Sequence, residues 1–97
     1  GGLMDEAMPE EEIRRIEAVL SAYGEARWQK LLTRRAGQRR FVHVELLVSP
    51  DWSVARAHAL ADQIEEAIAR ELPGTKVTTH IEPSPQPLSS PDGADGR

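Results

Sequence analysis

Apolar residues recur at intervals of three and four in two stretches of the chain, a spacing that places them on one face of a helix. The first stretch opens with Pro9 and three glutamates, which suit the first turn of a helix, and it predicts a helix over residues 9–23. The second follows Ser53, a suitable N-cap, and ends at Pro73, which predicts a helix over residues 54–72. Its expected buried stripe consists of Val54, Ala57, Ala61, Ile64, Ile68 and Leu72.

Alternating apolar and polar residues predict a strand over residues 41–48, and two further short segments predict strands over 26–33 and 76–82. The apolar face of the middle strand consists of Val42, Val44, Leu46 and Val48. The last strand is expected to direct Val77, Thr79 and Ile81 inward, and Lys76, Thr78, His80 and Glu82 outward. The first two strands should pair in antiparallel fashion through an arginine-rich turn over residues 34–40.

The resulting order of helix, strand, strand, helix and strand is an α+β arrangement rather than a doubly wound sheet. The connection between the last two strands should be right-handed, which lays them parallel in a mixed sheet of three strands. Both helices then cover one face and leave the other open. The expected residues of the open face are Gln29, Leu31, Phe41, His43, Glu45, Leu47, His80 and Glu82. Because apolar residues on an open face suit association, a homodimer is the expected state.

Composition limits both the size of the domain and its function. The 97 residues suffice for one domain, and segments rich in Gly, Pro, Ser and Asp predict disorder over residues 1–8 and 84–97, leaving 9–83 folded. The absence of cysteine excludes disulfides and thiolate metal sites, and the net charge of −4 disfavours nucleic acid as a partner. No apolar run could span a bilayer, and no nucleophile elbow or phosphate loop is present, which favours a soluble domain that is not an enzyme.

His80 and Glu82 are the clearest candidates for chemistry. Residues two apart on a strand share a face, and Glu45 is expected on the neighbouring strand, about 4.8 Å away. Imidazole and carboxylate groups are suitable ligands for Zn²⁺ or another divalent transition metal. His58, at the edge of the buried face of the second helix, is a fourth candidate. The alternative for all four residues is an ordinary solvated or structural role.

The run TRRAGQRR, residues 33–40, brings four arginines together. They form either a solvated hairpin tip or a basic patch for an acidic protein, nucleic acid or anionic headgroups. A sheet that binds RNA would display several stacking aromatic residues, and only Phe41 is expected on this face, so nucleic acid is again disfavoured.

The stretch from residue 31 to residue 83 resembles the cytoplasmic C-terminal domain of cation diffusion facilitator (cation efflux) transporters. The pattern of that family has a leucine and T-R-x-x-G before a hairpin, A-H-x-x-A-D in a helix, and P-G followed by V-x-x-H-x-(D/E)-P. The matching residues are Leu31, Thr33, Arg34, Gly37, Arg40, Phe41, Ala57, His58, Ala61, Asp62, Pro73, Gly74, Val77, His80, Glu82 and Pro83.

The resemblance implies a ferredoxin-like, metallochaperone-like fold and the tail of a membrane antiporter that exports zinc or a similar divalent cation against protons. Such a tail would lie on the cytoplasmic side of the cell inner membrane, form a homodimer, bind metal near the dimer interface and bias the membrane domain toward transport. It also implies metal ligation by His58, His80 and Glu82, with Glu45 and Gln29 standing where some relatives have histidine. One weak site or an altered metal preference is therefore expected.

Two other interpretations stay open at this stage. One is a free-standing metal-binding carrier protein of similar fold, which upstream membrane helices in the gene would exclude. The other is a dimerisation module that binds no metal, which a metal titration would distinguish from both.

Overall fold

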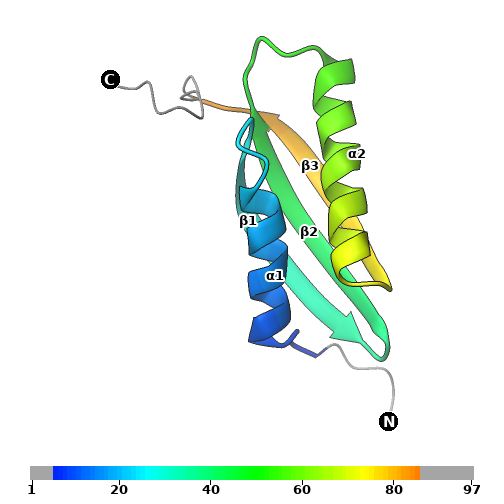
Figure 1. Cartoon of the computed structure of the whole chain (residues 1–97). Coiled ribbons are helices and arrows are strands. Elements are labelled where there is room, and N and C mark those ends of the chain that lie inside the picture. Colours follow the sequence, from blue (N-terminus) through cyan, green and yellow to red (C-terminus); the bar gives the residue numbers. More distant parts are fainter. Residues whose placement is uncertain (1–5, 86–97) are drawn as a thin grey trace.

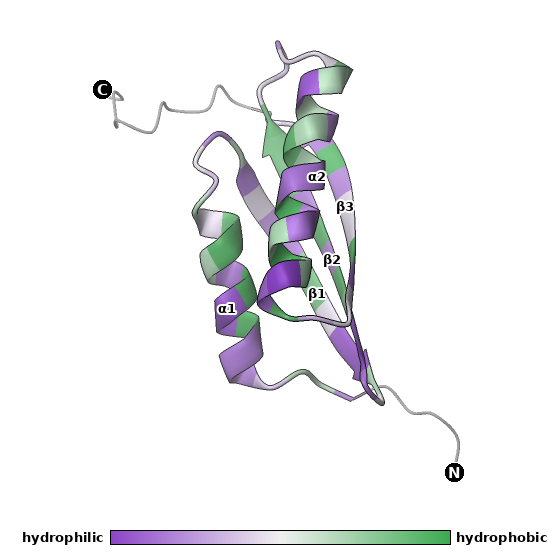
Figure 2. Cartoon of the chain, turned by 45° about the vertical axis from the view of Figure 1, so that its right-hand side comes forward, coloured by the Kyte–Doolittle hydropathy of each residue, from purple (hydrophilic) through white to green (hydrophobic). Residues whose placement is uncertain are grey.

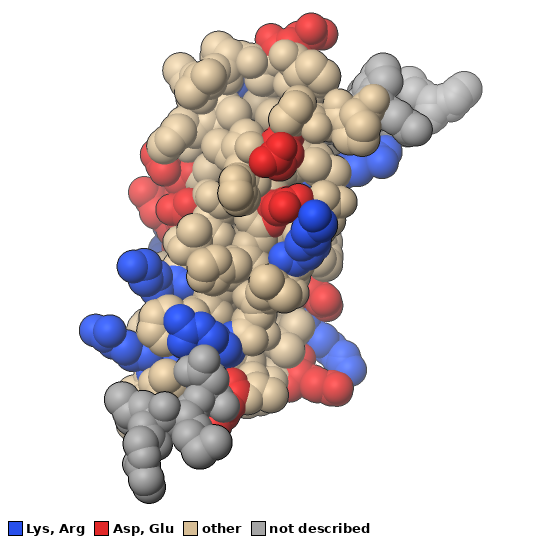
Figure 3. All heavy atoms as spheres, turned by 180° about the vertical axis from the view of Figure 1, so that it is seen from behind, with Lys and Arg blue, Asp and Glu red and all other residues tan. Residues whose placement is uncertain are grey.

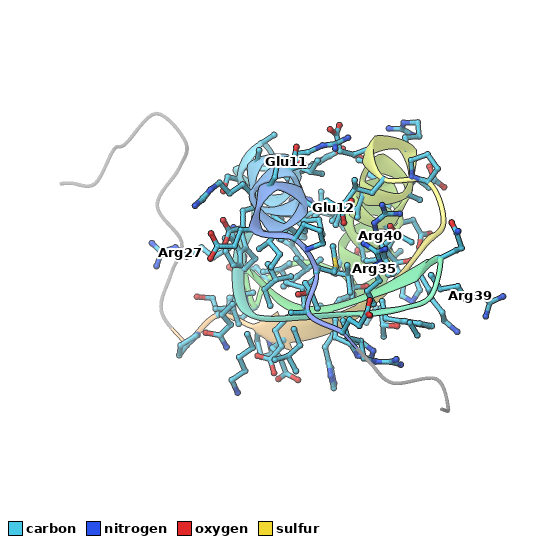
Figure 4. All side chains as sticks on the ribbon, turned by 90° about the horizontal axis from the view of Figure 1, so that it is seen from below. Glu11, Glu12, Arg27, Arg35, Arg39 and Arg40 are labelled. Atoms are coloured by element: carbon cyan, nitrogen blue, oxygen red, sulfur yellow. The ribbon has the colours of Figure 1, made fainter. Side chains whose placement is uncertain are left out.

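The computed structural model describes residues 6–85, which form two helices and three strands (Figure 1). The bounds are Glu10–Ser21 for α1, Arg27–Ala36 for β1, Arg39–Val48 for β2, Val54–Glu71 for α2 and Thr75–Pro83 for β3. β1 pairs with β2 in antiparallel orientation, and β2 pairs with β3 in parallel orientation. Viewed along the long axis, both helices lie on the same side of the sheet (Figure 4). The predicted α+β class, element order and mixed sheet are therefore confirmed. No helix in this part of the chain is long and apolar enough to cross a lipid bilayer.

The hydrophobic core lies between the sheet and the two helices. Figure 2 shows apolar positions, in green, along the faces that the helices turn toward the strands. The most deeply buried large side chains are Ile16, Val42, Leu46, Ile64 and Ile68. The predicted stripe of α2 is correct except at its start, because Val54 is 80% exposed in the first turn of the helix. Leu60, which the predicted stripe omitted, is buried at 5% exposure.

The N-terminal boundary of the packed region lies slightly before the predicted residue 9. Met8 is only 3% exposed and belongs to the core. The backbone of Glu6 exchanges hydrogen bonds of 2.7 and 2.8 Å with Arg35 at the end of β1. Most of the two terminal segments that were predicted to be disordered, residues 1–5 and 86–97, lies outside the described residues.

The hairpin between β1 and β2 is tighter than the sequence predicted. Backbone pairing continues from Arg34 opposite Phe41 to Ala36 opposite Arg39, so the arginines assigned to a turn over 34–40 lie in strands. Only Gly37 and Gln38 remain in the turn, and Gly37 has the positive φ of 62° that such a turn requires. The strands extend beyond the apolar pattern because the hydrogen bonds between strands are formed by backbone groups and do not depend on the side chain.

A β-bulge interrupts β1 between Gln29 and Leu32. Lys30 lies within it and has a φ of 55°, a left-handed conformation that non-glycine residues rarely adopt. The extra residue reverses the alternation, so Leu31 packs against the core while Leu32 is 67% exposed on the open face. The prediction that Leu31 lies on the open face is therefore wrong, because alternation was counted without the bulge.

The conformation of Lys30 gives a testable prediction about stability. Lys30→Gly is expected to be more stable than Lys30→Ala by about 0.5–1 kcal/mol, because glycine relieves the left-handed strain while both variants lose the same side chain. Urea denaturation of the two variants would measure the difference. The same pair of substitutions at Lys76, within regular strand β3, is the matched control and should favour alanine. An alanine variant at position 30 as stable as the glycine variant would contradict the prediction.

Candidate metal centre

Three of the four predicted ligands lie on the open face of the sheet. In the strand register Glu45 stands opposite His80, and Leu47 stands opposite Glu82. The His80 Nε2 atom lies 3.7 Å from Glu82 Oε2, and these side chains are 75% and 46% exposed. The alternation of β2 and β3 is confirmed, since their core-facing residues are the less exposed ones. The adjacent polar positions of β2 and β3 thus place one imidazole and two carboxylates on neighbouring strands.

Glu45 is the least exposed member of this group. Gln29 Nε2 donates a hydrogen bond of 2.8 Å to Glu45 Oε1, and the ammonium group of Lys30 lies 3.7 Å from Glu45 Oε2. The Gln29 hydrogen bond, followed by the positive charge of Lys30 and the neighbouring His80, holds the pKa of Glu45 below its ordinary value despite partial burial. The carboxylate is therefore ionised at neutral pH and already has two partners within the chain.

His58 lies apart from the other three candidates. It is exposed on α2, and α2 covers the face of the sheet opposite to the one that carries Glu45 and His80. The sheet thus separates His58 from them within one chain. His58 was predicted at the edge of the buried face of α2. Ala57 and Ala61 beside it are buried, while His58 itself is exposed.

Within residues 6–85, no three side chains of the His, Cys, Asp and Glu types converge closely enough to hold a metal ion. His80, Glu82 and Glu45 therefore provide an open, partial set of donors. Glu45 and His80 border a hollow of about 190 Å³ whose other lining residues include Lys30, Leu32 and His43, whereas Glu82 is not part of its lining. Such a surface could bind an ion fully only with donors from water or from another molecule.

Sequence reasoning identified the donor types and missed their neighbours. Lys30 was not connected to Glu45, and Leu32 was not placed on the open face, because both positions depend on the bulge in β1. The signal that could have located the bulge is the adjacent pair Leu31 and Leu32, which a regular strand would direct to opposite faces.

Residues 8–84 match the family described as the cytoplasmic domain of cation efflux proteins, a family named for its dimer. Over 89 residues, 90% of this chain, the sequence is 38% identical to an uncharacterized transporter of Synechocystis. Over 83 residues it is 37% identical to the cation-efflux pump FieF of Klebsiella pneumoniae. The chain spans less than a third of both relatives, 29% and 28% of their lengths.

Solved structures agree with this match. One solved structure is a zinc form of CzrB, described as a candidate zinc transporter, with a TM-score of 0.76 and 42% identity. The match covers 89% of this chain and 100% of the CzrB chain. The metal-bound C-terminal domain of the CzcD transporter from Thermotoga maritima has a TM-score of 0.74 and 25% identity, covering 79% of this chain and 92% of its own. The fold described above is thus shared with domains that were solved with metal bound.

Proposed function

The chain belongs to the family of cytoplasmic domains of cation efflux proteins, and we propose that it is the metal-sensing, dimer-forming part of a membrane transporter. The transporter would export a zinc-like divalent cation in exchange for protons. The family is one of transporter domains and not of enzymes, and similar domains were solved with metal bound. The metal, the antiport and the regulation are the proposed part.

The observation that carries this proposal is the group formed by His80, Glu82 and Glu45 on the open sheet face. An imidazole nitrogen and carboxylate oxygens suit zinc, so the donor set fits the ion even though it is incomplete within one chain. When bound, the ion would supply positive charge at a surface that is rich in carboxylates. His58, behind the sheet, would serve either a separate site or the site of a second copy.

The regulatory step that we propose is a shift between two arrangements of the dimer. Without metal, carboxylates such as Glu45 and Glu82 from two copies repel each other and favour separation of the domains. Metal neutralises this charge and increases the population of the closer arrangement. The size of the shift is set by the difference in the affinity of the ion for the two arrangements. Since a ligand imidazole must be unprotonated, acid should weaken both metal binding and closure.

Calorimetric titration of the chain with zinc tests the proposal, with the dimer state followed by sedimentation. Saturable binding is expected in the wild type. His80→Ala should weaken it at least tenfold, because even the loss of a hydrogen-bond partner of a ligand typically lowers metal affinity by about 10–100-fold. His43→Ala is the matched control, because His43 is exposed on the same face of β2 and is not a proposed ligand. A wild type that does not bind zinc would refute metal sensing.

One observation favours a second candidate, a dimerisation module that needs no metal. The carboxylate of Glu45 already has two partners within the chain, the amide of Gln29 and the ammonium group of Lys30. These groups can donate to the carboxylate in place of a metal ion. The exposed Leu32 provides an apolar contact on the same face. A stable dimer that neither binds zinc nor changes in its presence would favour this alternative.

A further inference from the structure

A hollow of about 400 Å³ lies at the hairpin end of the sheet, away from the candidate metal centre. It is lined by Gln38, Arg39, Arg40, Phe41, Gly74, Thr75 and Lys76. Three of these residues are cationic, and none of them carries a carboxylate. A cavity with this lining favours an anion, and its backbone and hydroxyl groups could add hydrogen bonds to oxygen atoms.

The fold holds this hollow in place. The backbone N–H of Arg40 donates a 3.2 Å hydrogen bond to the Gly74 carbonyl, which joins the start of β2 to the turn before β3. Arg40 donates further bonds to Glu12 at 2.7 and 2.8 Å and to the Pro73 carbonyl at 3.1 Å. Its guanidinium is thus fixed as one wall.

Arg39 and Lys76 are the available cations of the hollow. Both are exposed, and neither forms a side-chain hydrogen bond or ion pair with another residue between 6 and 85. Arg35 lies on the same hairpin (Figure 4), and Arg34 lies 4.0 Å above the Phe41 ring. Figure 3 shows blue side chains gathered at the lower left of the open face, where the hairpin lies. The hollow therefore belongs to a larger basic surface.

The direction of the chain shows what this end faces if the proposed function holds. Glu6 pairs with Arg35, so the polypeptide enters the domain beside the hairpin. β2 then runs for 10 residues, roughly 33 Å, to the far end, where Ser84 bonds to Val48. In the CzcD transporter the similar domain is C-terminal, which places the rest of that protein on the N-terminal side. By the same connection, the basic end of this domain would face the membrane.

On that basis we propose that the hollow binds the phosphate of an anionic phospholipid headgroup at the membrane surface. Arg39 and Lys76 supply the long-range attraction, and the fixed Arg40 supplies a guanidinium against the phosphate. Each cation near an anionic bilayer raises partitioning by about fivefold, so Arg39 and Lys76 together account for about twenty-five-fold. The contact would hold the domain in one orientation beneath the bilayer.

Co-sedimentation with vesicles of phosphatidylglycerol and phosphatidylcholine tests this proposal. Binding is expected that is absent with phosphatidylcholine alone, decreases with salt, and falls about twenty-five-fold in Arg39→Gln/Lys76→Gln. The control is Arg27→Gln/Arg56→Gln, which changes the charge equally at exposed positions at the start of β1 and of α2, away from the hairpin, and should keep most of the binding. Equal losses in both double variants would overturn the site.

A second measurement covers the case of weak affinity. The chain contains no cysteine, so Gly1→Cys allows attachment by the N-terminal end to vesicles that carry maleimide lipid. Slower hydrogen exchange at Gly37 to Arg39 on anionic vesicles than on neutral ones would support the proposal.

Equal exchange rates on anionic and neutral vesicles would overturn the proposal, leaving an acidic protein as the partner of this surface. Resonance shifts with inorganic phosphate but no vesicle effect would overturn the lipid assignment in favour of a free anion. Zinc plays no part in these measurements, so their failure leaves the proposed metal function to its own titration.

Discussion

Ile68→Ala is expected to lower the free energy of unfolding by about 3–4 kcal/mol, a large part of the stability of a domain of this size. Ile68 is 0% exposed in the buried stripe of α2 and belongs to the core between the helices and the sheet. Truncation removes apolar contacts and leaves a cavity that surrounding side chains can fill only in part. Urea denaturation monitored by circular dichroism would measure the loss.

Val54→Ala is the matched control for this prediction. Val54 lies on the same helix but is 80% exposed, so its truncation should change the stability by less than about 0.5 kcal/mol. Similar losses at both positions would mean that α2 does not pack as described. The comparison also bears on function, because α2 covers the face of β2 and β3 opposite to Glu45 and His80.

The packed side of the fold was predictable because one-sided burial leaves a strong pattern in the sequence. Val42, Val44 and Leu46 alternate with polar residues, and that alternation alone identifies both β2 and its buried face. Pro73 and Gly74 marked the end of α2 for an equally local reason, since neither residue continues a helix easily.

The features that were not predicted depend on tertiary pairing. The adjacent residues Leu31 and Leu32 are compatible with a bulge, but only the pairing of β1 with β2 places it at Lys30 and decides which of the two leucines faces the core. The arginine strands beyond residue 33 were taken for a turn because their side chains are not apolar, although their backbones pair regularly.

The same distinction applies to the candidate metal centre. The strand period of two predicted that His80 and Glu82 share a face, and the parallel register confirms that Glu45 lies beside them. Metal ligation by these residues stays a prediction. The Gln29 and Lys30 contacts to Glu45 required the bulge, and they now define the competition that an incoming ion would meet.

Arg40→Met is expected to lower the free energy of unfolding by about 2 kcal/mol at neutral pH. Arg40 forms two hydrogen bonds with Glu12, and these side chains are only 21% and 14% exposed, so the substitution leaves a carboxylate largely buried without its cation. The Arg40–Glu12 pair also joins α1 to β2. The same guanidinium donates a further hydrogen bond to the Pro73 carbonyl. Chemical denaturation at several pH values would measure the loss.

The effect of Arg40→Met should depend on pH in a defined direction. The hydrogen bond and charge of Arg40 hold the pKa of Glu12 below its ordinary value of 4.5 in the folded state. A carboxyl group with a lowered folded pKa contributes its stabilisation above the unfolded pKa and loses it as the pH falls through the folded pKa. The difference in unfolding free energy between wild type and variant should therefore be constant near neutrality and shrink below about pH 4.5.

The control is Arg15→Met, which removes a more exposed partner of Glu71 and should lower the free energy of unfolding by less than Arg40→Met does. A difference at Arg40 that persists unchanged in acid would show that Glu12 is not the group being stabilised, and that Arg40 acts through its packing and its bond to Pro73.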